Sequence, residues 1–214
     1  TMITGVLLGS TLVIVEKKSK SFFRNSVTPT SDIVFHAGTY LSGLIVMAVQ
    51  LFVFLMISSF LFKTNVWQSL SMNILIILCI SSLFILIGML IGVLFKSEET
   101  TTLAAISVSS LLLFFSSTVL PLESMPNYIM KVAEYNPFVI SVDLLKESIF
   151  FDLTFEKLSI KIILLLAYII LAFISITYIQ KTMRAKAFYS MHRKSKENKI
   201  TSMYKEFAKK KEKE

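Results

Sequence analysis

The sequence predicts an all-α protein that crosses a membrane several times. Of its 214 residues, 54% are hydrophobic, and the mean hydropathy is +0.71, which is too apolar for an ordinary water-soluble domain. No Asp, Glu, Lys or Arg lies between Asp32 and Lys63, or between Lys63 and Lys96. Each interval can cross a hydrocarbon core, which needs about 20 apolar residues. Unpaired backbone amides are not tolerated in lipid, and these runs lack the alternation of a barrel strand, so we expect helices.

The expected transmembrane domain covers residues 1–184. Residues 2–15 are apolar but too few for a full crossing. They resemble the second half of a transmembrane helix, and we expect the chain to be a fragment of a longer protein. A signal peptide is the weaker interpretation, because the run lacks a basic n-region. The expected complete spans are residues 37–62, 70–95, 101–120 and 162–180.

Positive charge predicts the orientation of the chain. Residues 181–214 carry 12 basic and 4 acidic side chains, which accounts for the whole net charge of +8. By the positive-inside rule, this tail and the loop at residues 16–35 face the cytoplasm. The tail, residues 185–214, either lies on acidic lipid or is a disordered charged segment. No recognition motif accompanies its charge, so nucleic acid is not an expected partner.

Two loops carry unusual features. Residues 19–27 of the cytoplasmic loop could form a short interfacial helix with Phe22 and Phe23 toward lipid or a partner, or could be a solvated connector. The outer loop, residues 121–161, keeps apolar runs between its charges. We therefore expect two short interfacial or re-entrant helices there, broken around Asn136 and Pro137.

The sequence offers no catalytic or metal-binding motif. The only histidines, His36 and His192, lie at the edge of a span and in the tail, and there is no HExxH pattern. A phosphate-binding loop of the GxxxxGK[ST] type is also missing. The apolar spans contain no Asp or Glu, so the carboxylate relays of pumps and secondary transporters are absent from them. No catalytic residue and no metal ligand is predicted.

The polar residues within the spans are uncharged. For each we favour a hydrogen bond between helices, because buried polar groups in lipid need partners whatever the function. Lining of a substrate path is the alternative. Gly88 and Gly92 also form a small-xxx-small pattern that permits close helix approach. The candidate path-lining residues are Gln50, Asn73, Ser81 and Ser82.

The order of these features resembles the membrane subunits of type-two ABC exporters. In that family a loop beginning with Glu and basic residues reaches a Thr-Pro or Ser-Pro before the next span. This chain has EKKSKSFFRNSVTPTSD at Glu16–Asp32. The family also has PLESMP and then Asn-Pro before its last span. The matching outer residues here are Pro121, Glu123, Pro126, Asn136, Pro137 and, downstream, Asp143. The usual glycine and threonine of the loop are replaced by Ser19, Lys20 and Ser21.

The resemblance implies a permease subunit of an exporter of this kind. It implies a homo- or heterodimer in the plasma membrane, with a cytoplasmic C-terminus, that forms a substrate path. Separate ABC ATPase subunits would bind ATP and magnesium, and this chain would bind no cofactor. The alternative is a membrane scaffold or assembly factor whose loop and tail dock partners. The residues that would contact the ATPase are Glu16, Lys18, Phe22, Phe23, Arg24 and Asn25.

Overall fold

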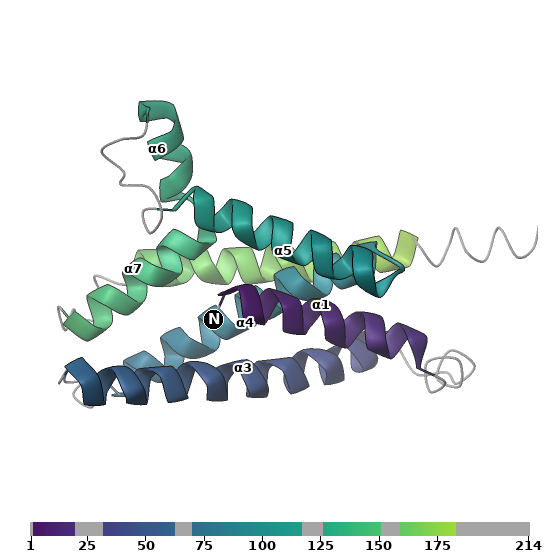
Figure 1. Ribbon diagram of the computed structural model, residues 1–214, viewed down its shortest axis with the longest axis horizontal. Coiled ribbons are helices and arrows are strands. Elements are labelled where there is room, and N and C mark those ends of the chain that lie inside the picture. Colours follow the sequence, from purple (N-terminus) through teal and green to yellow (C-terminus); the bar gives the residue numbers. More distant parts are fainter. Residues whose placement is uncertain (1, 20–31, 63–69, 117–125, 151–158, 183–214) are drawn as a thin grey trace, which may run out of the picture. The chain divides into compact units, whose positions relative to one another are not determined.

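A computed structural model describes residues 2–19, 32–62, 70–116, 126–150 and 159–182, and every element within them is a helix (Figure 1). The chain divides into two compact units, Thr1–Ile176 and Thr177–Glu214. The helices described below belong to the first unit, except for the end of the last one. They are α1 (Met2–Lys18), α3 (Asp32–Phe62), α4 (Leu70–Leu94), α5 (Glu98–Phe114), α6 (Asn127–Glu134), α7 (Pro137–Phe150) and a last helix, Ser159–Thr182. This all-helical fold confirms the predicted fold class.

Helix α4 is the centre of the bundle. It contacts α1, α3, α5 and α7, and α1 in turn contacts α3 and α5. In its most apolar stretch 67% of the residues are buried, against 11% for α3 and 22% for the last helix. These three helices are long and apolar enough to cross a membrane. A helix that is apolar all round must be buried in protein or in lipid. Helix α4 is therefore the core helix, and the other two leave apolar faces for lipid or a partner protein to cover.

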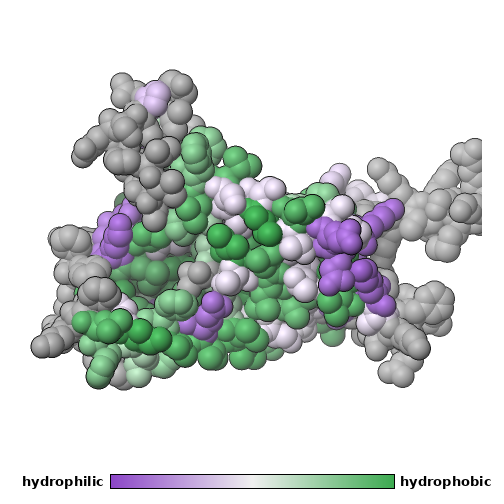
Figure 2. Space-filling view, viewed as in Figure 1, coloured by the Kyte–Doolittle hydropathy of each residue, from purple (hydrophilic) through white to green (hydrophobic). Residues whose placement is uncertain are grey.

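The outward face of α3 has the composition expected for contact with lipid. Phe54 is 56% exposed, Phe60 89% and Leu61 68%. On the last helix Ile160 is 77% exposed and Leu171 63%. Figure 2 shows apolar side chains over most of the described part of this face, with the largest group of hydrophilic side chains where α1 ends and α5 begins. An apolar surface of this extent is typical of a protein that contacts lipid or a partner protein.

Glycines set the close crossing of α1 and α4. A Cβ built on Gly88 would lie 2.2 Å from the Val6 carbonyl oxygen and 3.0 Å from Gly9 Cα. A Cβ on Gly92 would lie 2.7 Å from the Ser10 carbonyl oxygen. These are backbone atoms of the opposite helix, so no side chain could be accommodated by a rotamer change. The structure confirms that the Gly88 and Gly92 pattern permits close approach, and it places Gly9 of α1 opposite.

Several helix ends differ from the expected ones. Helix α1 continues to Lys18, so the first residues of the expected cytoplasmic loop form its last turn. Helix α3 begins at Asp32, five residues before the expected start of that span. Helix α5 ends at Phe114, whereas the span was expected to reach Leu120. Helix α5 ends early because the Asn136 side chain, from the segment between α6 and α7, binds its last carbonyl groups. The expected start of the tail at residue 185 lies outside the described residues.

Two helices, α6 and α7, occupy the described part of residues 121–161, the loop expected on the outer side, and the break between them is at Asn136 as expected. Pro137 suits the first position of α7, because a proline there loses no helical hydrogen bond.

Candidate functional site

Three consecutive charged residues at the end of α1 each bind a different helix. Thr39 of α3 donates a hydrogen bond to the Glu16 carboxylate. Lys17 donates to carbonyl groups at the end of α4, and Lys18 pairs with Glu98 at the start of α5. We call these three residues and their partners the α1-end cluster. It joins the last turn of α1 to α3, α4 and α5.

Lys17 caps α4. Its Nζ lies 2.7 Å from the carbonyl oxygen of Gly92, 2.8 Å from that of Val93 and 3.5 Å from that of Phe95. The last carbonyl groups of a helix have no partner within the helix, and they carry partial negative charge. A lysine from a neighbouring helix satisfies both needs. Burial lowers the pKa of Lys17 from 10.5 to about 8.

Glu16 is also partly withdrawn from water. Burial raises the pKa of its carboxyl group, and the hydrogen bond from Thr39 partly opposes that shift because it stabilises the ionised form. Thr39 itself is 7% exposed. The pair therefore ties the end of α1 to the first turns of α3 through a partly buried contact.

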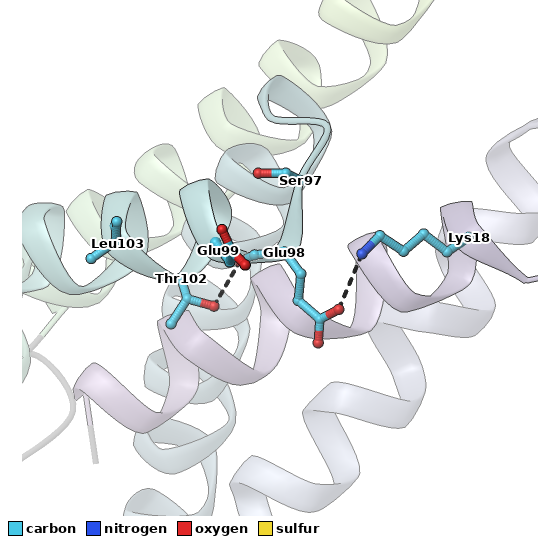
Figure 3. Close-up of a pocket in the computed structure, with 6 residues that line it drawn as sticks. All are labelled: Lys18, Ser97, Glu98, Glu99, Thr102 and Leu103. Carbon is cyan, nitrogen blue, oxygen red and sulfur yellow. Dashed lines mark hydrogen bonds and ion pairs between the residues drawn. The ribbon is translucent and has the colours of Figure 1, made fainter.

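Lys18 lines a surface pocket of about 820 Å³ (Figure 3). Its Nζ is 3.1 Å from Glu98 Oε2, and the two side chains are 52% and 55% exposed. An ion pair so exposed contributes little to stability. The start of α5 is capped locally, because Ser97 accepts a hydrogen bond from the Thr100 amide and Glu98 and Glu99 lie in the positively polarised first turn. The pocket is lined by Lys18, Ser97, Glu98, Glu99, Thr102 and Leu103.

The shifted Lys17 pKa predicts a pH dependence of stability. Between pH 8 and 10.5 the unfolded chain keeps the Lys17 proton while the folded chain releases it, so the free energy of unfolding rises with pH in that window. Lys17→Met should lose this rise. Thermal unfolding of both proteins in detergent at about pH 7 and pH 9.5 measures the difference. If the stability of the wild type relative to Lys17→Met instead falls as the pH rises, the folded protein favours the ammonium form of Lys17 over the amine.

A second cluster lies at the opposite end of α5, at the α5–α7 junction. The Asn136 side-chain amide donates to the carbonyl oxygens of Leu112 (2.7 Å) and Phe115 (3.0 Å). Its oxygen accepts from the Phe138 amide at 3.0 Å and so caps α7. Asn136 is 7% exposed. One side chain therefore ends α5 and starts α7, which explains why α5 stops at Phe114.

Helix α7 also binds the last helix through charge. Lys161 Nζ lies 2.6 Å from Glu147 Oε1 and 3.9 Å from Asp143 Oδ2. Asp143 and Glu147 are four residues apart, so they share one face of α7. Lys161 therefore pairs with two acidic residues of α7.

The sequence matches the family model described as ABC-2 type transporter over residues 1–150, which is more than half of the chain. The chain belongs to the ABC-2 type transporter family. No curated protein and no solved structure matches it. As an ABC-2 permease it is a multi-pass membrane protein, and the family implies that it works with ABC ATPase subunits. The resemblance drawn from the sequence is confirmed.

The structure places some of the expected ATPase-contact residues of this permease. Glu16 and Lys18 belong to the last turn of α1 and are bound within the chain. The remaining four, Phe22, Phe23, Arg24 and Asn25, lie outside the described residues. Among the outer motif residues, Pro121 and Glu123 also lie outside them, and Pro126 is exposed just before α6.

The candidate path residues mostly join helices. Gln50 Nε2 donates to Thr4 Oγ1 at 3.1 Å, and the Ser82 and Tyr40 hydroxyls are 2.7 Å apart. Ser148 of α7 donates to Asn73 Oδ1 at 2.7 Å. Each of these three side chains therefore makes a hydrogen bond to another helix. The fourth, Ser81, is fully buried, and its hydroxyl has no partner among the described residues.

Sequence reasoning missed Lys17, Lys161 and the glycines of α1. Lys17 was counted only as loop charge, because the helix end that it caps lies 75 residues away in the chain. The Gly5-xxx-Gly9 spacing in α1 matches that of Gly88 and Gly92 and could have been found as a second close-packing motif.

Proposed function

We propose that this ABC-2 permease, with a second permease subunit, forms the substrate path of an exporter driven through residues 16–35 by ATPase subunits. The observation that supports it best is the α1-end cluster. The loop that would contact the ATPase follows directly from a helix end bonded to α3, α4 and α5. A force applied to that loop would therefore act on several helices at once.

The proposed mechanism needs no chemistry from this chain. ATP and magnesium would bind the ATPase subunits, whose closure would move residues 16–35 and the attached helices between two arrangements. The described part of the chain contains no group of three or more His, Cys, Asp or Glu residues that could hold a metal ion. The mild polar residues of the spans place no restriction on the exported substrate.

The proposed orientation follows from charge. The basic tail and residues 16–35 would face the cytoplasm, with the tail close to the acidic lipids of the plasma membrane. Helices α6 and α7 would then lie at the outer side, where the charged groups of α7 and Lys161 would meet the interface.

Replacing Phe22 and Phe23 together by alanine tests the proposed coupling. If both rings are buried against the ATPase, each contributes roughly 1.5–3 kcal/mol to the association. The double variant should fold and insert, yet lose both co-purification of the ATPase and ATP-driven export in vesicles. A surface segment contributes little to the packing of the bundle, so stability should stay near that of the wild type.

The matched control is Phe54→Ala with Phe60→Ala, which removes two rings from the exposed face of α3. It deletes the same side-chain atoms where lipid contact is expected, so ATPase association should persist. Wild-type association and export by the Phe22 and Phe23 double variant would favour the scaffold alternative and rule out coupling through this segment.

A further inference from the structure

We propose that Lys17 is a positioning residue for ATP-driven movement, because it fixes the end of α1 to the end of α4. Movement of the segment that follows α1 would then be transmitted to the central helix of the bundle. This inference rests on the proposed function.

Lys17 connects the end of α1 to the end of α4 by hydrogen bonds. Its amine reaches three carbonyl groups at the end of α4, at 2.7, 2.8 and 3.5 Å. Within the described part of the chain it makes no ion pair. Its hydrogen bonds thus serve to hold α4, and they do not compensate another charge.

The packing of α1 on α4 also links the two helices. Gly9, Gly88 and Gly92 bring the two backbones into direct contact, and Val13 of α1 and Phe84 of α4 are buried. Close packing of this kind transmits a displacement of one helix to the other. The directional hydrogen bonds from Lys17 extend the contact to the ends of both helices and fix one end relative to the other.

Helix α4 is well placed to carry movement across the bundle. Beyond its capped end it is largely buried and contacts α3, α5 and α7. Near its other end Asn73 accepts a buried hydrogen bond from Ser148 of α7. A displacement of the Lys17 end would therefore reach α7 on the far side of the bundle, provided that the helix moves as a rigid body.

Lys96 provides a matched control. It lies two residues beyond the end of α4 and carries the same charge, but it is exposed and takes no part in the ion pairs of the described residues. Lys96→Gln should leave movement of α4 unchanged, whereas Lys17→Gln should not. Lys17→Arg keeps donors that can reach the same carbonyl groups and should restore the wild-type behaviour.

The experiment uses the full permease–ATPase complex in lipid, with the native Cys79, the only cysteine, replaced by serine. Spin labels at Val15 and Leu94, both exposed, report the distance between the ends of α1 and α4. A separate cysteine at the exposed Ser71, at the opposite end of α4, reports its ATP-dependent movement through its labelling rate. Each measurement is made without nucleotide and after trapping with ATP and vanadate.

In the wild type the Val15–Leu94 distance should stay constant on trapping, while labelling at Ser71 changes. In Lys17→Gln the ATPase should still co-purify, but the distance should shift on trapping and the labelling change at Ser71 should fall several-fold. If labelling at Ser71 changes as much in Lys17→Gln as in the wild type, the inference is wrong. This holds even if the variant is less stable than the wild type. If the wild-type permease neither binds the ATPase nor responds to ATP, the proposed function itself fails, which is a distinguishable result.

Discussion

Replacing Gly88 by alanine is expected to separate α1 from α4. The new Cβ would lie 2.2 Å from the Val6 carbonyl oxygen and 3.0 Å from both Gly9 Cα and the Ser10 amide nitrogen. All three are backbone atoms, so the helices must move apart along their whole contact. Overpacking costs roughly 1–3 kcal/mol even where side chains can adjust. We expect a clear loss of thermal stability in mild detergent and a lower yield of monodisperse protein.

Gly38 provides the control for the Gly88 substitution. It also lies within a spanning helix, α3, but a Cβ there would meet no atom within 4 Å. Gly38→Ala should be neutral or slightly stabilising, because alanine favours the helix by about 1 kcal/mol. Equal behaviour of the two alanine variants would show that the α1–α4 crossing does not depend on close backbone contact at Gly88.

The membrane-spanning helices could be predicted because lipid imposes a local rule on sequence. A stretch without charges and long enough to span hydrocarbon must be helical, and α3 and α4 follow from the intervals on either side of Lys63. The break between α6 and α7 was equally local, since Asn136 and Pro137 favour a helix start wherever they occur.

Contacts between helices were harder to predict from the sequence. Which side of α4 meets α1 depends on the register of two helices, and one apolar face looks like another when a helix is apolar all round. Gly88 and Gly92 gave a hint of close packing, but their opposite residues in α1 could be named only from the structure. The capping role of Lys17 could not be predicted for a similar reason. Its partners are backbone carbonyl groups 75 and 76 residues away in the chain. Every residue has such a group, so the sequence does not distinguish these two.

The end of α5 shows how a distant side chain can override a local pattern. Residues 101–120 contain no charged residue, glycine or proline, so nothing local predicts an end at Phe114. The last carbonyl groups are divided among specific partners. Leu111 accepts from the Phe115 amide and Leu113 from the Ser116 amide, while Leu112 and Phe115 accept from Asn136.

Asn136→Ala is therefore expected to destabilise the α5–α7 junction strongly. It removes the cap of α7 and leaves the Leu112 and Phe115 carbonyl groups without their described donor. Loss of an N-cap costs about 0.5–2 kcal/mol, and a buried polar group left unsatisfied costs about 1–3 kcal/mol. A total on the order of 3 kcal/mol should appear as a large fall in thermal stability, and as increased hydrogen exchange at the end of α5 and the start of α7.

Asn136→Asp separates the two roles of this side chain. Aspartate caps helices as well as asparagine does, so a residue needed only to start α7 would tolerate the change. It has no amide hydrogens to donate, however, and its charge would face the carbonyl oxygens at the end of α5, where the helix is already negatively polarised. We expect Asn136→Asp to be at least as unstable as Asn136→Ala, with exchange raised mainly at the end of α5. Wild-type stability of the aspartate variant would mean that Asn136 acts as a cap alone and that α5 ends at Phe114 for another reason.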